Sequence, residues 1–159
     1  MLSRDIVRTD LTIAAPNVLS ILRCDIQNAY LTAPCRKNIW MTAGNEFGST
    51  PGKKMLLVRV LYGLKLSGAA FRTFLAEALY NIGYKYSVAD PDVWLMSDIK
   101  EKDGFRYWEY VLCYVDDVLC ISKNPMHTTK GIQSKLKLKD EKMEKTNVYL
   151  GAELFIMDN

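Results

Sequence analysis

Two adjacent carboxylates, Asp116 and Asp117, lie within residues 111–122, a stretch that carries no other charged residue. Carboxylates held side by side repel each other, which raises one pKa unless a cation neutralises the pair. Mg²⁺ takes carboxylate oxygens as ligands, so a bound Mg²⁺ ion is the chemistry that this pair suggests. The alternative interpretation is that both acids are ordinary turn residues on the surface.

The residues around the pair predict a β-hairpin. Residues 111–122 read Val-Leu-Cys-Tyr-Val-Asp-Asp-Val-Leu-Cys-Ile-Ser, with β-branched and aromatic residues on both sides of the acids. Such runs are typical of two paired strands, and we expect both acids at the tight turn between them. Neither acid is a Gly or Asn, the residues that accept positive φ in two-residue turns, so we expect a strained turn.

A third acid, Asp25, ends the β-type run from Val18 to Ile26. A carboxylate at the end of a buried strand costs free energy unless something there uses it. Asp25 and the 116–117 turn can lie at neighbouring strand ends, but sequence spacing alone does not bring them together.

The elements that must position these acids follow from hydrophobic periodicity. We expect helices at 3–15, 69–82 and about 125–136, and strands at 18–26, 39–41, 53–62, 93–96, 108–114, 118–122 and 149–155. Alternation of lysine and leucine at 134–139 fits a strand equally well. This order predicts an α+β fold in which an antiparallel sheet is covered on one face by helices.

Composition is that of a globular chain. The 159 residues suit one domain with a core, and the net charge of +3 permits a nucleic-acid partner without indicating one. The four cysteines have no C-x-x-C spacing and His127 is the single histidine, which excludes a zinc site of the usual pattern. No run reaches membrane-spanning length, and Cys24, Cys113 and Cys120, which lie in apolar runs, are expected to be buried thiols of an intracellular protein.

Several motifs occur together in the order of one family. They are Asp25 with Tyr30 five positions later, Leu-Tyr-Gly-Leu-Lys-x-Ser at 61–67, Ala-Asp-Pro at 89–91, Tyr-Val-Asp-Asp at 114–117 and Tyr-Leu-Gly at 149–151. This arrangement resembles the palm of reverse transcriptases, specifically of copia-type retrotransposon Pol polyproteins, from about residue 3 to 155. The resemblance implies a partial palm domain over 1–159 with a ferredoxin-like core. It also implies remnants of the fingers and no thumb, with most of the fingers before residue 1 and the thumb and RNase H after residue 159.

The resemblance implies an RNA-directed DNA polymerase that transfers a nucleotide from a dNTP to a primer 3′-hydroxyl. Asp25 and Asp116 look like the two main catalytic aspartates and Asp117 like the more peripheral third acid, together ligating two Mg²⁺ ions, or Mn²⁺ in their place. The chemistry agrees with the argument from the residues, because phosphoryl transfer depends on positioning and on charge neutralisation by metals.

The resemblance also implies substrate contacts. Tyr30 resembles the steric gate beneath the incoming sugar. The other nucleotide-binding positions are Ile26, Lys65 and Ser67. The primer and template positions are Tyr114, Val115, Tyr149, Leu150 and Gly151. Lys142 or Lys145 would take the place of the lysine that protonates pyrophosphate, although a charged turn explains both equally well. Many members have Gln-Ser-Pro-Arg-Ala-Trp where residues 66–71 read Leu-Ser-Gly-Ala-Ala-Phe, which puts the template-facing contacts in doubt but not the acids.

The partners that the resemblance implies are an RNA/DNA primer-template, a dNTP and the rest of the Pol polyprotein, including integrase and RNase H, with no membrane. The implied location is intracellular, in a cytoplasmic virus-like particle, which leaves room for a nuclear phase. Two alternatives stay open: an element fragment that keeps the fold without polymerising, and a nucleic-acid-binding or assembly module in which the acids serve only as turn residues.

Overall fold

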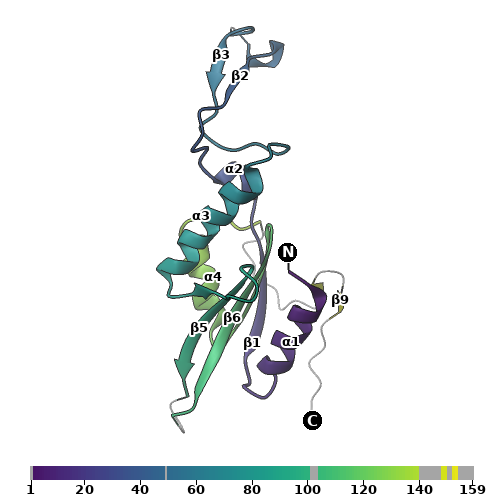
Figure 1. The fold of residues 1–159 in the computed structure, drawn as a ribbon, viewed down its shortest axis with the longest axis vertical. Coiled ribbons are helices and arrows are strands. Elements are labelled where there is room, and N and C mark those ends of the chain that lie inside the picture. Colours follow the sequence, from purple (N-terminus) through teal and green to yellow (C-terminus); the bar gives the residue numbers. More distant parts are fainter. Residues whose placement is uncertain (1, 49, 101–103, 140–147, 150–151, 154–159) are drawn as a thin grey trace. The chain divides into compact units, whose positions relative to one another are not determined.

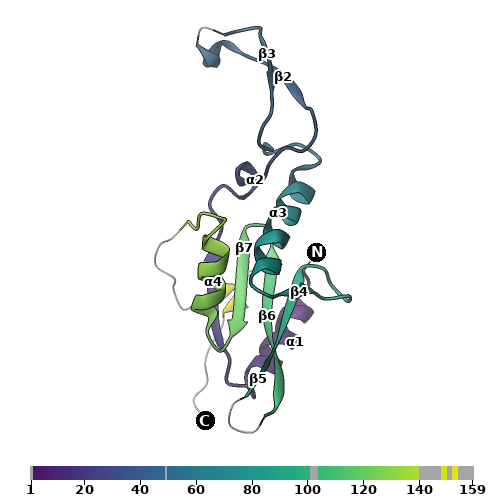
Figure 2. The same cartoon turned by 90° about the vertical axis from the view of Figure 1, so that its left-hand side faces the viewer.

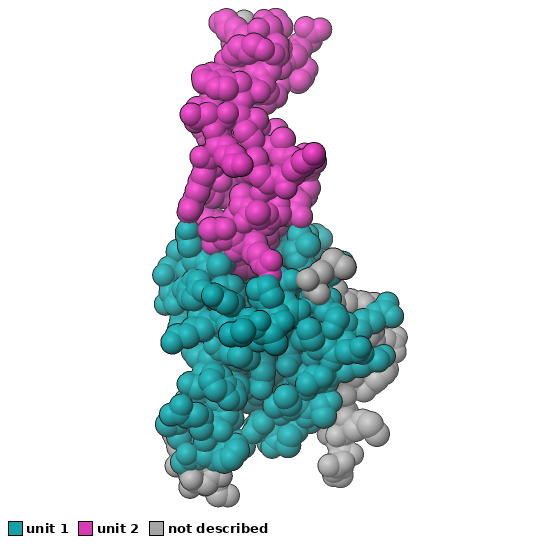
Figure 3. Space-filling model, viewed as in Figure 1, with its two compact units in different colours: residues 1–27, 76–159 teal, residues 28–75 magenta. Residues whose placement is uncertain are grey.

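A computed structural model describes residues 2–48, 50–100, 104–139, 148–149 and 152–153 of the chain. The chain divides into two compact units, Met1–Gln27 with Ala76–Asn159, and Asn28–Leu75 (Figure 3). The single domain over 1–159 stays a prediction.

An antiparallel sheet of five strands, in the order β1-β7-β6-β5-β4, forms the centre of the first unit (Figure 1). The strands are β1 Ser20–Asp25, β4 Lys85–Tyr86, β5 Val93–Ile99, β6 Arg106–Tyr114 and β7 Asp117–Ser122. The hairpin of β6 and β7 is the predicted one, and β1 pairs along the other side of β7. The predicted α+β class with an antiparallel sheet is confirmed.

The central strand β7 is buried from Val118 to Ser122 because both faces of the sheet are covered. Leu119 and Ile121 belong to the core on one face, together with Leu112 of β6. Val118 and Cys120 alternate with them and are fully buried on the other face. Burial on both sides explains why residues 111–122 read as a continuous apolar run rather than an alternating one.

Helices cover both faces of the sheet, whereas the sequence predicted helices on one face only. The helix α1, Arg4–Ala14, begins at Ser3, whose Oγ accepts a hydrogen bond from Ile6 N at 3.2 Å, and packs Val7 and Ala14 into the core beside Leu112 and Leu119. The helix α4, Pro125–Gln133, lies on the opposite side of the sheet (Figures 1 and 2). Both faces need cover because both sets of alternating side chains on β6 and β7 are mainly apolar.

A buried polar network connects α4 with the sheet. The Tyr84 hydroxyl lies 3.0 Å from Thr128 Oγ1 of α4 and donates to Glu109 Oε2 of β6 at 3.5 Å. Glu109 also accepts a hydrogen bond from the backbone N–H of Lys123 at 2.9 Å. These partners satisfy a carboxylate that would otherwise be costly to bury.

The long helix α3, Ser67–Asn81, matches the helix predicted at 69–82. Gly83 adopts a φ of 98° directly after it, a left-handed conformation that suits glycine and ends the helix. Tyr84 N–H and Gly83 N–H donate to the last helical carbonyls, those of Leu79 and Tyr80. These two hydrogen bonds satisfy carbonyl groups at the C-terminal end of α3.

The second unit contains α2 Ala29–Thr32, the hairpin of β2 Trp40–Thr42 with β3 Lys54–Leu56, and the short 3₁₀ helix η1 Asn45–Phe47. The strand predicted at 53–62 is paired only at 54–56, with one further bridge between Arg59 and Pro34. On either side of this bridge, the N–H groups of Cys35 and Val60 donate to the carbonyls of Val58 and Ala33 at 3.0 and 3.1 Å.

Two further segments differ from the prediction. β8 Val148–Tyr149 pairs with the antiparallel strand β9 Ala152–Glu153, where a single strand at 149–155 was expected. The helix expected to reach residue 136 ends at Gln133, and the strand-like alternative for 134–139 is realised only as one bridge between Leu138 and Ile26.

Cys24, Cys113 and Cys120 are buried free thiols, as expected, and Cys35 is half-buried. Within the described ranges, no helix is both long and apolar enough to cross a lipid bilayer.

Candidate functional site

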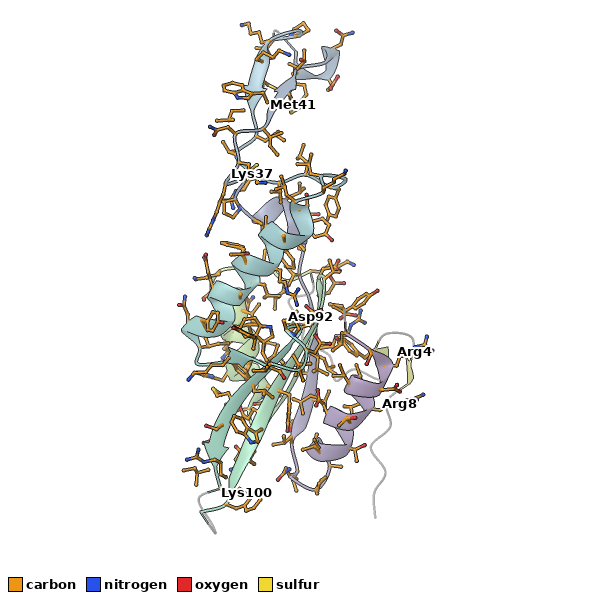
Figure 4. All side chains as sticks on the ribbon, viewed as in Figure 1. Arg4, Arg8, Lys37, Met41, Asp92 and Lys100 are labelled. Atoms are coloured by element: carbon orange, nitrogen blue, oxygen red, sulfur yellow. The ribbon has the colours of Figure 1, made fainter. Side chains whose placement is uncertain are left out.

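Asp25 and Asp117 occupy directly opposite positions at the paired ends of β1 and β7. Opposite residues of antiparallel strands project to the same face, with Cβ atoms about 5 Å apart. The fold therefore brings together two acids that lie far apart in the sequence. Figure 4 labels Asp92, just before β5, at this end of the sheet, and Lys100, just after β5, at the other end.

The third acid, Asp116, lies in the turn of the β6–β7 hairpin. Because Tyr114 pairs with Asp117, the two turn residues are Val115 and Asp116. The prediction that both acids sit at the tip is therefore wrong for Asp117, which is the first residue of β7. The carbonyl of Asp116 accepts a hydrogen bond from Ile26 N at 2.8 Å, which ties the turn to the end of β1.

The expected strain falls on Val115 rather than on an acid. Val115 adopts a φ of 55°, a left-handed conformation that is rare for a β-branched residue and costs of order 1–3 kcal/mol. A positive φ at the first of two turn residues matches the right-handed twist of the flanking strands. The strained backbone thus presents Asp116 beside Asp25 and Asp117.

Two cations, which sequence reasoning missed, are paired with these acids. Arg23 Nε donates to Asp117 Oδ1 at 2.6 Å, and Lys139 Nζ donates to Asp25 Oδ2 at 3.2 Å. The proximity of Arg23 to the acids was predictable, because Arg23 lies two residues before Asp25 in the same strand and therefore projects to the same face. Lys139 had no local signal, since its place depends on the Ile26–Leu138 bridge and on its N–H donating to the Asp25 carbonyl at 2.8 Å.

Asp117 experiences the charges of both other acids and of Arg23. Burial raises the pKa of Asp117 above its usual range, the hydrogen bond and charge of Arg23 lower it, and the charges of Asp25 and Asp116 raise it again. The pKa of Arg23 is raised mainly by its hydrogen bond to Asp117. This end of the sheet therefore collects negative charge that cations neutralise.

The acids at this end of the sheet fit a divalent cation that takes part of its ligands from a bound substrate. In the part of the chain that the structure describes, no group of three or more Asp, Glu, His or Cys side chains is preformed around a metal position. Asp117 is paired with Arg23 at 2.6 Å, whereas Asp25 is paired at 3.2 Å with the more exposed Lys139, so Asp25 and Asp116 are the carboxylates more open to a metal. Mg²⁺ is commonly held by one or two carboxylates together with substrate phosphates, so two acids suffice.

Other residues predicted in this unit have structural contacts. Ile26 is 1% exposed, and Tyr149, also 1% exposed, donates from its hydroxyl to the Leu112 carbonyl at 3.4 Å. Tyr114 is half-buried against the core, while Val115 at the turn is exposed. Their predicted roles stay predictions. Leu150, Gly151, Lys142 and Lys145 lie outside the described residues.

The remaining predicted nucleotide contacts belong to the second unit. The Tyr30 ring lies 4.9 Å from the Tyr62 ring and 6.0 Å from the Phe71 ring, measured between centroids. Ser67 is buried and donates from its hydroxyl to the Leu61 carbonyl at 2.5 Å, which closes the loop through Gly63. Lys65 on this loop is exposed. Whether these residues contact a nucleotide stays a prediction.

Comparison with known proteins decides the family. The model of the family described as "Reverse transcriptase (RNA-dependent DNA polymerase)" matches residues 1–158. The chain belongs to the reverse transcriptase family. It is also similar to the Retrovirus-related Pol polyprotein from transposon RE1 of Arabidopsis thaliana, with 28% identity over 152 residues. That match covers 92% of this reverse transcriptase chain and 10% of the polyprotein.

Proposed function

We propose that this chain is the palm core of a copia-type RNA-directed DNA polymerase that adds a deoxynucleotide to a primer 3′-hydroxyl on an RNA or DNA template. The observation that carries the proposal is the placement of Asp25 opposite Asp117 and beside the Asp116 turn, in a chain of the reverse transcriptase family. Nucleotidyl transfer needs clustered acids that hold metal ions against a triphosphate.

Asp25 and Asp116 are proposed to hold two Mg²⁺ ions, or Mn²⁺, and Asp117 to be the peripheral acid. The bound metals would supply activation of the primer hydroxyl and neutralisation of charge on the leaving pyrophosphate. The protein's part is to hold its two carboxylates in place. The hydrogen bond from Ile26 N to the Asp116 carbonyl fixes the backbone of Asp116, and the β1–β7 ladder fixes the backbone of Asp25.

Lys139 is proposed to bind the triphosphate of the incoming nucleotide. Its ammonium pairs with Asp25 at 3.2 Å, and its side chain is 62% exposed. An exposed ion pair contributes at most about 1 kcal/mol, so the ammonium is free to exchange its carboxylate for a phosphate oxygen. A lysine in this place also carries a proton that a leaving pyrophosphate can accept.

Tyr30 is proposed to select the sugar. Its ring packs against the rings of Tyr62 and Phe71 within the second unit, and these contacts restrict the movement of the Tyr30 side chain. A fixed aromatic ring excludes an added 2′-hydroxyl by steric contact. Tyr114 and Val115 are proposed to meet the primer end, with 149–151 as the primer grip.

The test is primer extension on an RNA template by the chain within its Pol polyprotein, with Mg²⁺ and dNTPs. Asp116→Asn is expected to abolish extension, whereas Asp5→Asn, a change of an exposed acid on α1 (side chain 91% exposed), leaves extension unchanged. Equal extension by Asp116→Asn and the parent would show that the catalytic assignment is wrong.

The partners we propose are a primer-template, a dNTP and the remainder of a Pol polyprotein, acting in a cytoplasmic particle. The alternatives give different results in the same assay. A decayed element binds primer-template but extends no primer with any variant. A binding or assembly module binds nucleic acid equally well in the parent and in Asp116→Asn, and its binding does not depend on Mg²⁺.

A further inference from the structure

Arg23 and Lys139 hold their acids with different tightness. The Arg23–Asp117 ion pair has a separation of 2.6 Å, and its side chains are 37% and 15% exposed. The Lys139–Asp25 pair has a separation of 3.2 Å, and its side chains are 62% and 25% exposed. The arginine pair is therefore both shorter and better shielded from water, which strengthens it.

The backbone around Arg23 is also the more firmly held. Arg23 lies inside β1, opposite Leu119 of β7, and its neighbours Leu22 and Cys24 are buried. Lys139 instead follows a single isolated bridge at Leu138. A divalent cation that approaches these acids will displace the lysine far more readily than the arginine.

We infer that Arg23 is a positioning residue that keeps Asp117 out of metal coordination, so that Asp25 and Asp116 alone supply the carboxylates for the metals. This inference rests on the proposed function and specifies it. Arg23 acts through Asp117, because its guanidinium contacts that carboxylate and neutralises its charge. Asp117 in turn faces Asp25 across the strand pair, so an unpaired Asp117 would become a competing third ligand.

Removing Arg23 should therefore strengthen metal binding while weakening catalysis. In Arg23→Gln, the Asp117 carboxylate loses its cation partner beside Asp25 and can become a ligand of the divalent cation, whose charge would favour the ionised carboxylate. A charge restored within several Å of a divalent ion should raise its affinity by roughly tenfold. The metals would then be held in an unproductive geometry, and loss of alignment costs catalysis about tenfold or more.

The experiment measures Mn²⁺ binding to the full chain by electron paramagnetic resonance, and primer extension in the Pol polyprotein. The variants are Arg23→Gln, Arg23→Lys, Asp25→Asn and the double variant Arg23→Gln/Asp117→Asn. Arg106→Gln, a change of an exposed arginine at the far end of β6, is the matched control. We expect tighter Mn²⁺ binding and slower extension in Arg23→Gln alone. Arg23→Lys and the double variant should bind Mn²⁺ as the parent does.

A merely structural role for Arg23 predicts a lower melting temperature without tighter Mn²⁺ binding, and that result would overturn the inference. Because the double variant removes one positive and one negative charge together, it tests the inference even where Arg23→Gln does not fold. Weaker Mn²⁺ binding in the double variant than in the parent would show that Asp117 is a ligand. A parent that binds no Mn²⁺, or Asp25→Asn that binds it as the parent does, overturns the proposed function as well.

Discussion

Asp25 and Asp117 face each other directly across the β1–β7 strand pair. One ends the first strand of the sheet and the other begins the last strand of the hairpin, so the fold itself makes the acid cluster. The β6–β7 turn adds Asp116 to the same place through the hydrogen bond of its carbonyl to Ile26 N. The site is thus part of the sheet and does not depend on a loop closing.

The turn that presents Asp116 is strained at Val115, which has a φ of 55°. Val115→Gly should relieve this strain and raise the free energy of unfolding by up to about 1 kcal/mol, since the side chain is 44% exposed and little burial is lost. Chemical denaturation measures the change. Val118→Gly, at a fully buried strand position, is the control and should cost at least about 2 kcal/mol. A destabilised Val115→Gly would show that the turn is unstrained.

The carboxyl of Asp10 on α1 is 7% exposed, and its Oδ2 has no hydrogen-bond partner in the described part of the chain. Burial raises the pKa of Asp10 from 3.8 to about 6. The neutral acid is favoured in the folded state, so its stabilising contribution is complete below pH 3.8 and is lost as pH rises through about 6.

Asp10→Leu should therefore stabilise the chain at pH 8 by roughly 2 to 3 kcal/mol, and the gain should shrink as pH falls towards 4. Urea denaturation at several pH values measures the difference between variant and parent. Asp5→Leu changes an acid of α1 whose side chain is 91% exposed and pairs with Arg8, the residue labelled in Figure 4, and should show no such trend. A gain that is independent of pH would contradict the buried titration of Asp10.

Gly131 of α4 packs directly on Ile82. An added Cβ at Gly131 would lie 2.4 Å from Ile82 Cγ2, closer than atoms can approach. Gly131→Ala should destabilise the chain by about 1 kcal/mol or more, although alanine is favoured over glycine in a helix by about 1 kcal/mol. In an Ile82→Ala background the same change should become stabilising. Additive effects in this double-mutant cycle would show that the two residues do not meet.

Tyr30 is expected to govern the choice between deoxyribonucleotides and ribonucleotides. Tyr30→Ala should raise the relative incorporation of ribonucleotides by at least about tenfold, because the ring that blocks a 2′-hydroxyl is removed. Competition assays with the active polyprotein measure this ratio. Tyr86→Ala, which removes an exposed tyrosine from a separate aromatic cluster, should leave the ratio unchanged. An unchanged ratio in Tyr30→Ala would show that Tyr30 is only a packing residue.

Much of the fold follows from local pattern. The hairpin, the helix α1 after Ser3, and the end of α3 at Gly83 were all predictable, because apolar periodicity and capping residues act over short distances. The helical cover on the second face of the sheet was not predictable. The strands are apolar on both faces, and this pattern does not indicate which helix covers which face.

The site was predictable in its acids and not in its cations. Asp25 and Asp116 stood out as charges in or beside apolar strands, but the exact turn residues depend on the register of β6 against β7. Lys139 reaches Asp25 from 114 residues away, and no local pattern carries that information. The position of Arg23 could have been predicted, because a residue two positions before Asp25 in the same strand projects to the same face of the sheet.

The most direct test of the account is the melting temperature of the chain with and without Mg²⁺ or Mn²⁺. We predict that either cation raises the melting temperature of the parent and of Asp5→Asn, because a ligand that binds only the folded state stabilises it. The same cations should have no effect on Asp25→Asn or Asp116→Asn. An equal rise in all four proteins, or no rise in the parent, would contradict a metal site built from Asp25 and Asp116.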